Sequence, residues 1–180
     1  MTMRLALRKL GLAAHVTASV GWLGAVGVFL ALAVVGVTDQ DAQTVRGAYL
    51  VMEPAARYLL VPLAVASLLT GIVQSLGTPW GLFRHYWVVF KLLMNIFATV
   101  VLLMYLETFR SMAAVAADPG ADLVAVKNPS PILHAVLALL LLLLAAGLGV
   151  YKPRGMTRYG WRKQHGQGPQ DAGRPAGPTA

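Results

Sequence analysis

Apolar runs long enough to cross a membrane alternate with short polar segments along the whole chain. A span needs about 20 mainly apolar residues, and four windows reach that length. They cover residues 10–38, 58–83, 85–106 and 128–151. Three of them contain no charged residue, and the third in chain order is interrupted by Lys91 alone. The pattern predicts an all-α fold, an integral membrane four-helix bundle with spans at about residues 10–37, 55–77, 85–107 and 130–151.

The first apolar window also fits the start of a secretory signal, because Arg4, Arg8 and Lys9 precede it. Signal cores are about 7–15 residues long and end at a small-residue cleavage site, whereas this run is roughly twice as long. We therefore interpret it as a retained helix. After it, residues 38–53 have apolar positions at roughly helical spacing, which predicts a partly helical loop that ends at Pro54.

The composition agrees with a chain whose solvent is lipid. Hydrophobic residues make up 57% of the 180 residues and charged residues only 12%, too few to coat a soluble globule. The length suits one domain. We expect residues 1–9 to form a cytoplasmic N-terminus, residues 10–152 the transmembrane domain, and residues 153–180 a basic tail. That tail becomes rich in glycine and proline from Gly166 onward, which predicts disorder.

Lysine and arginine are distributed unequally between the two sides of a four-span chain. One side carries ten of them: Arg4, Arg8, Lys9, Arg84, Lys152, Arg154, Arg158, Arg162, Lys163 and Arg174. The other side carries four, together with six of the seven acidic residues. Because cytoplasmic segments are enriched in lysine and arginine, both termini are expected in the cytoplasm. The net charge of +8 is then mainly a topology signal, and the expected partner is the lipid bilayer rather than nucleic acid.

Lys91 is a candidate functional residue because a charge inside a bilayer is costly. If the third helix enters the membrane at His85, Lys91 lies about 9 Å below the interface, at 1.5 Å per residue. A lysine can snorkel to the headgroups over that distance, so an interfacial anchor is the alternative interpretation. His15 on the first helix lies about 7.5 Å below the same interface.

Other polar or aromatic residues accompany these two at helical spacing: Ser19 and Trp22 on the first helix, Ser67, Thr70 and Gln74 on the second, and Asn95 on the third. For each polar residue alone, the simpler interpretation is a hydrogen bond that holds helices together. In combination with a histidine and a lysine, they indicate the lining of a site.

Histidine is the natural protein ligand for haem iron in a membrane bundle, and His15 is the first candidate for this metal. His85 lies on the same side but near the interface, so it becomes a second axial ligand only if the register is a turn deeper. His134 lies at the opposite end of the fourth helix, about 18 Å in depth from His15, and one iron cannot take both. We expect His134 to be a capped interfacial histidine.

Copper handling is a further hypothesis, because thioethers suit Cu(I) and the chain contains Met94, Met104 and Met112. These methionines form no tight cluster in the sequence, and Met94 and Met104 suit gap-filling between helices better. The absence of cysteine excludes disulfides, thiolate metal sites and cysteine catalysis.

Three stretches resemble a group of uncharacterised bacterial four-helix membrane proteins. They are AHVTASVGWLGAVGVFLAL, LGTPWGLFRHYWVVFKLL and VYKPRGMTRYGWRKQ. The group is related to the membrane domain of copper resistance protein D and, distantly, to the HemJ-type protoporphyrinogen oxidases. The resemblance implies a four-helix fold in a bacterial inner membrane. It also matches His15 and Lys91 to the histidine and lysine that the oxidases associate with haem and porphyrin chemistry, whereas the oxidases' later histidine has no counterpart in residues 92–106.

These observations predict a small haem-binding or redox-associated membrane protein, with haem b or another porphyrin as its cofactor. The predicted cofactor-binding residues are His15, Lys91, Trp22, Asn95, Gln74 and His85. The alternative is a non-catalytic accessory membrane protein whose polar residues only join helices. Copper transport or handling is the third hypothesis.

Overall fold

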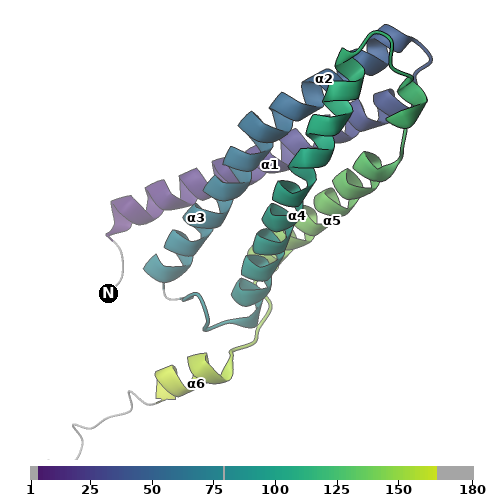
Figure 1. Ribbon diagram of the computed structural model, residues 1–180. Coiled ribbons are helices and arrows are strands. Elements are labelled where there is room, and N and C mark those ends of the chain that lie inside the picture. The colour runs from purple at the N-terminus through teal and green to yellow at the C-terminus, as the bar shows by residue number, and fades with distance from the viewer. Residues whose placement is uncertain (1–3, 79, 166–180) are drawn as a thin grey trace, which may run out of the picture.

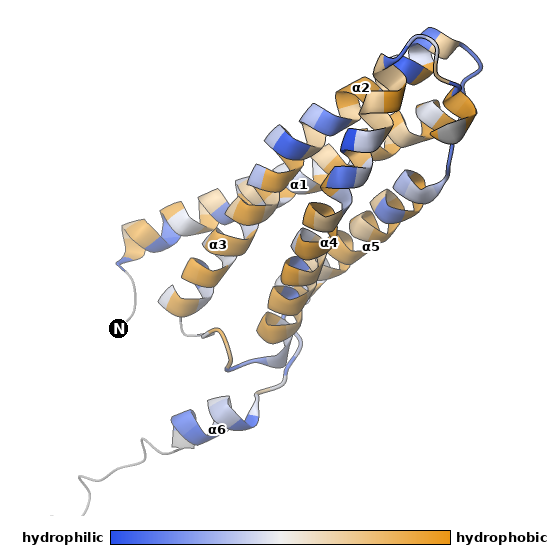
Figure 2. Cartoon of the chain, in the orientation of Figure 1, coloured by the Kyte–Doolittle hydropathy of each residue, from blue (hydrophilic) through white to orange (hydrophobic). Residues whose placement is uncertain are grey.

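The computed structural model describes residues 4–78 and 80–165, and most of them are helical (Figure 1). Four helices are long and apolar enough to cross a membrane: α1 (Leu5–Thr38), the continuous helix Ala42–Gly77, α4 (Tyr86–Ala117) and α5 (Ser130–Tyr151). Apolar residues dominate these helices, and polar residues gather in the connections (Figure 2). The predicted all-α four-helix bundle with four candidate spans is confirmed. The predicted disorder of residues 166–180 lies outside the described residues.

The second long helix joins the predicted loop helix to the predicted span. It consists of α2 (Ala42–Ala55), the π-helical turn η1 (Ala56–Leu60) and α3 (Val61–Gly77). Pro54 does not end the first part, because it lies inside α2, and Pro62 lies in the first turn of α3. A proline removes one helical hydrogen bond and crowds the carbonyl four residues earlier. A π turn lies between the two prolines, and in it Val61 N–H donates to Ala56 O. The extra residue in this turn allows the helix to continue past both prolines.

The bundle has two unlike ends. We call the end with residues 39–41 and 118–129 the acidic end, and the end with residues 78 and 80–85 the basic end. α4 continues ten residues past its predicted boundary at residue 107, and α2 packs against it at the acidic end. Much of the hydrophobic core lies in this half, with buried side chains that include Val45, Tyr49, Met52, Phe109 and Met112.

Polar contacts close the acidic end. The Arg46 guanidinium donates hydrogen bonds to five carbonyl oxygens at the end of α4 and in the next loop, those of Val115, Ala116, Asp118, Pro119 and Ala121. Lys127 Nζ donates to Asp39 O at 2.7 Å and joins the two loops. Asp41 caps α2 by accepting from Thr44 N and Thr44 Oγ1, and these hydrogen bonds hold the pKa of Asp41 below its ordinary value.

At the basic end the helices diverge, and Figure 1 shows α1 running apart from α4 and α5. The segment after α5 folds back on the connection between α3 and α4. Thr157 N donates to Arg84 O at 2.9 Å, and Tyr86 N donates to Gly155 O at 3.4 Å. The helix α6 (Arg158–His165) follows, where the sequence predicted only a basic tail. Gly160 packs so closely against the backbone of Arg84 that a Cβ there would overlap Arg84 O.

Candidate functional site

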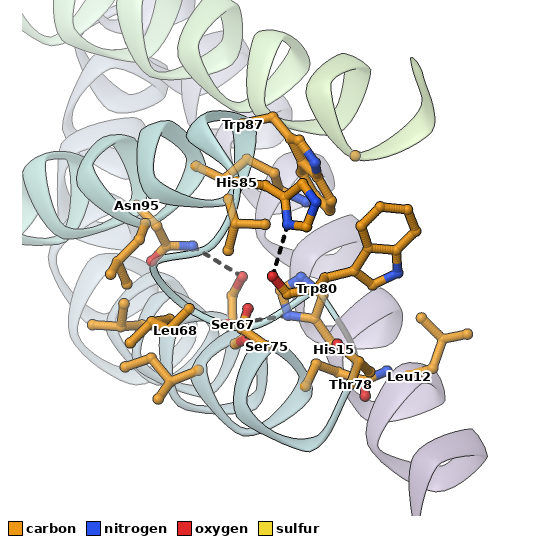
Figure 3. Close-up of a pocket in the computed structure, with 18 of the residues that line it drawn as sticks. Leu12, His15, Ser67, Leu68, Ser75, Thr78, Trp80, His85, Trp87 and Asn95 are labelled. Carbon is orange, nitrogen blue, oxygen red and sulfur yellow. Dashed lines mark hydrogen bonds between the residues drawn. The ribbon is translucent and has the colours of Figure 1, made fainter. Parts of the chain in front are cut away.

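A cavity of about 710 Å³ lies at the basic end between α1, α3, α4 and the last turns of α5 (Figure 3). Its volume falls within the range of about 300–1,000 Å³ that is usual for cofactor and small-molecule sites. Four cationic side chains line it, those of Arg8, Lys9, Lys91 and Lys152, whereas no described lining residue is acidic. The cavity therefore favours an anionic ligand.

The imidazole of His15 is held against α3. Its Nδ1 lies 3.1 Å from Ser67 O and 3.1 Å from Thr70 Oγ1. Because a carbonyl oxygen can only accept, Nδ1 carries the hydrogen and Nε2 carries the lone pair. Gly71 leaves room for the ring, since a Cβ at this position would lie 3.0 Å from His15 Cε1. His15 is thus fixed through one nitrogen, and the other has no hydrogen bond to a described residue.

Lys91 lines the same cavity from α4 and is half-buried. Its Nζ lies beside the backbone of α5 at Gly149, where a Cβ would come within 2.7 Å of Nζ. Among the described residues, no carboxylate pairs with Lys91 and no acceptor forms a hydrogen bond with it. An ammonium group in such surroundings calls for an anionic or polar partner.

Ser67 joins three helices next to the cavity. Its buried side-chain oxygen lies 2.9 Å from Ser19 Oγ of α1 and accepts from Asn95 Nδ2 of α4 at 3.2 Å. These are the interhelical hydrogen bonds that the simpler interpretation of the sequence expects. Because the Ser67 backbone also holds His15, one residue of α3 positions both His15 and Asn95.

Three buried polar atoms of cavity-lining residues have no hydrogen-bond partner in the described part of the chain. They are Gln74 Oε1, Trp87 Nε1 and Asn95 Oδ1. The other amide atom of Gln74 is engaged, because Nε2 donates to Arg8 O at 3.4 Å. A buried polar atom left unpaired costs about 1–3 kcal/mol. Two acceptors and one donor of lining residues are therefore buried beside the cavity without a partner among the described residues.

An aromatic cluster borders the cavity at the basic end of α4. The Trp80 ring centroid lies 5.2 Å from that of His85 and 5.7 Å from that of Trp87. Lys152 Nζ lies 5.5 Å from the Trp80 centroid, a cation–π contact. His85 Nδ1 donates to Trp80 O at 2.8 Å, so in the neutral ring Nε2 carries no hydrogen. Figure 3 shows both histidines among the lining residues.

The structure brings five of the six predicted residues to this cavity: His15, Gln74, His85, Lys91 and Asn95. Trp22 is the exception, since it is 2% exposed in the core and lines a second cavity nearer the acidic end. It shares a helical stripe with His15, but seven residues of helix separate the two by about 10 Å along the axis. A stripe places residues on one face without placing them at one depth.

Several residues of the site could not be predicted from the sequence. Gly71 and Gly149 make room for the His15 ring and the Lys91 ammonium, and no local spacing reveals this because the side chains they admit come from other helices. Trp80, Trp87 and Lys152 also line the cavity. Their signal was the gathering of aromatic and basic residues at the span ends, which is typical of membrane interfaces and therefore pointed to no site.

Comparison of the chain with known protein families, curated protein sequences and solved structures gives no match. The family resemblance therefore stays a prediction. The fold and the cavity define a helical protein with four candidate membrane spans and a basic, histidine-containing cavity at one end.

Proposed function

We propose that the protein binds a porphyrin of the haem b class in the basic-end cavity, with His15 Nε2 as the iron ligand. The hydrogen bond from His15 Nδ1 to Ser67 O carries this proposal, because metal-binding histidines usually donate their second ring nitrogen to a carbonyl or carboxylate. Apolar lining residues from three helices, Leu12, Leu68 and Leu92, suit the faces of a macrocycle.

The cations of the cavity suit the two carboxylates at the edge of such a porphyrin. Lys91 offers the most deeply placed charge, Arg8 lines the cavity from α1, and Lys152 lines it from the position directly after α5. Hydrogen bonds between ammonium or guanidinium groups and carboxylates are among the strongest in proteins. A propionate beside Lys91 supplies the partner that this ammonium lacks among the described residues. When bound, the iron supplies one-electron redox or ligand-binding chemistry, while the chain binds and orients it.

The membrane setting belongs to the same proposal. The positive-inside bias puts the basic end in the cytoplasm, and the resemblance suggests a bacterial inner membrane. In this orientation the porphyrin lies in the cytoplasmic half of the bilayer.

A visible absorption spectrum of protein purified from haem-supplied cells tests the proposal. We expect a Soret band that is lost in His15→Ala, because the iron loses its ligand. His134→Ala is the matched control, since this histidine lies at the second cavity, and it should keep the band. A colourless wild-type protein, or a Soret band of equal strength in folded His15→Ala, contradicts the proposal.

The Ser67 hydrogen bonds favour a second candidate function, a non-catalytic accessory membrane protein. They join α1, α3 and α4 without any ligand. This candidate predicts a protein that stays colourless with ample haem, so the same spectrum separates the two. Copper handling has no comparable support, because Met112 is buried in the core whereas Met104 is 77% exposed.

A further inference from the structure

A second cavity, of about 230 Å³, lies nearer the acidic end, and the two cavities share no lining residue. It lies mainly between α1, α4 and α5. Its lining is apolar and rich in rings, which belong to Trp22, Phe29, Phe97, Tyr105, Phe109 and His134. No charged residue lines it. This cavity therefore excludes ionic ligands and favours an apolar one.

The size and walls of the second cavity suit an aromatic ring. A dry apolar cavity of about 150 Å³ is large enough to bind benzene, so 230 Å³ accommodates a ring with small substituents. The walls already pack edge to face, with centroid distances of 4.7 Å for Phe29 and Phe109 and 4.8 Å for Tyr105 and Phe109. Aromatic rings prefer this geometry, and a ligand ring can extend it.

His134 gives this cavity one polar corner. Its Nδ1 donates to Ser130 O at 2.8 Å, so in the neutral ring Nε2 carries the lone pair and accepts. The ring lies 4.3 Å from the Tyr105 ring, and the Tyr105 hydroxyl is occupied by Ser130 Oγ at 2.5 Å. His134 Nε2 has no hydrogen bond to a described residue. A ligand that pairs with it has to supply a donor, such as a hydroxyl group.

The route into this cavity leads from the bilayer. Phe97 of α4 and Leu137 of α5 both line it, yet they are 62% and 54% exposed on the apolar outer surface of the bundle. In a membrane-spanning chain this surface meets lipid tails. A ligand that enters between α4 and α5 is therefore lipid-soluble.

We propose that the second cavity binds the ring of a lipid-soluble hydroquinone or phenol, whose hydroxyl group donates to His134 Nε2. The hydroxyl-bearing form is preferred over the quinone, because a quinone offers only acceptors to a nitrogen that itself accepts. The site does not depend on porphyrin binding at the basic end.

The test is calorimetric titration of trimethylhydroquinone into the full-length protein in lipid nanodiscs, with empty nanodiscs as the blank for partitioning. We expect saturable binding at one site. Trimethylbenzoquinone should bind the wild type about tenfold more weakly, because it has no hydroxyl group to donate to Nε2. His134→Phe should bind the hydroquinone about tenfold more weakly, because the variant has no Nε2 to accept the hydrogen bond. His15→Ala, which alters only the other cavity, should bind as the wild type does.

Cavity-filling variants test the location separately from the hydrogen bond. Ala138→Phe places a ring in the second cavity and should abolish binding, and Ala98→Leu is a milder filling variant if the larger change impairs folding. Equal affinity for hydroquinone and quinone, or unchanged affinity in folded His134→Phe, overturns the hydrogen bond. Unchanged binding in a folded filling variant overturns the site.

Discussion

At the scale of single residues, the basic-end cavity is built from charged or polar groups and the glycines that admit them. Gly71 receives the His15 ring, and Gly149 receives the Lys91 ammonium. The sequence alone placed His15 and Lys91 at one depth, because that inference needs only helix rise and the span boundaries. It did not reveal the two glycines, since their role depends on which helices face each other.

Substitutions of Lys91 distinguish a ligand-binding role of this residue from a role as an interfacial anchor. If it pairs with a porphyrin propionate, Lys91→Met leaves that carboxylate without its counter-charge, at a cost of about 3–5 kcal/mol for a dry pair. We expect lower haem content and a lower melting temperature in Lys91→Met. Lys91→Arg should restore only part of both, because a wider planar group has to fit beside Gly149.

Gly149→Ala tests the same contact without removing the charge. A methyl group 2.7 Å from Lys91 Nζ displaces the ammonium, so haem content should fall while the net charge is unchanged. Haem content per protein and thermal unfolding are measured for all three variants. Wild-type haem content and melting in all of them would identify Lys91 as a snorkelling anchor.

At the scale of helices, hydropathy predicted the cores of all four spans, and the bounds of α5 agree with the predicted span at residues 130–151. It failed where tertiary contacts override local signals. Pro54 is a usual helix end, yet the helix continues through it. Glu107 and Arg110 resemble loop residues, yet α4 continues to Ala117 because its last turns pack against α2.

Arg46 of α2 joins this helix to the last turn of α4 and to the loop that follows. Its loss should therefore weaken the acidic end. Hydrogen bonds from a charged group contribute about 1.5–3 kcal/mol each when buried. The loss in the variant is smaller than their sum, because water can bond to some of the carbonyls that Arg46 no longer reaches. We expect Arg46→Met to destabilise the fold by about 2 kcal/mol and to lower the melting temperature measured by circular dichroism. Arg46→Lys should recover little, because one ammonium cannot bridge five carbonyls.

The matched control for Arg46 is Arg57→Met, on the same long helix. Arg57 pairs with Glu53 at 2.7 Å, but its side chain is 43% exposed, and exposed pairs contribute about 0–1 kcal/mol. An equal loss of stability in the two methionine variants would contradict the bridging role of Arg46.

At the scale of the whole molecule, the two halves of the bundle differ in packing. The acidic half holds much of the core and its loops are tied by Arg46 and Lys127, whereas the helices of the basic half diverge around the larger cavity. The charge pattern predicted which residues share an end. The divergence itself has no local sequence signal, because it depends on contacts between helices that lie far apart in the sequence.

Single-cysteine labelling tests the orientation of the whole bundle, and the chain has no cysteine of its own. Gln40 and Gln164 are a matched pair, since both are neutral and exposed, one at the acidic end and the other in α6. With four spans and the positive-inside bias, a membrane-impermeant maleimide added to intact bacteria should label Gln40→Cys and should reach Gln164→Cys only after permeabilisation. The reverse pattern would place the porphyrin cavity on the outer side of the membrane. Labelling of both from outside would contradict four spans, because three of the spans lie between positions 40 and 164 and an odd number of spans places them on opposite sides.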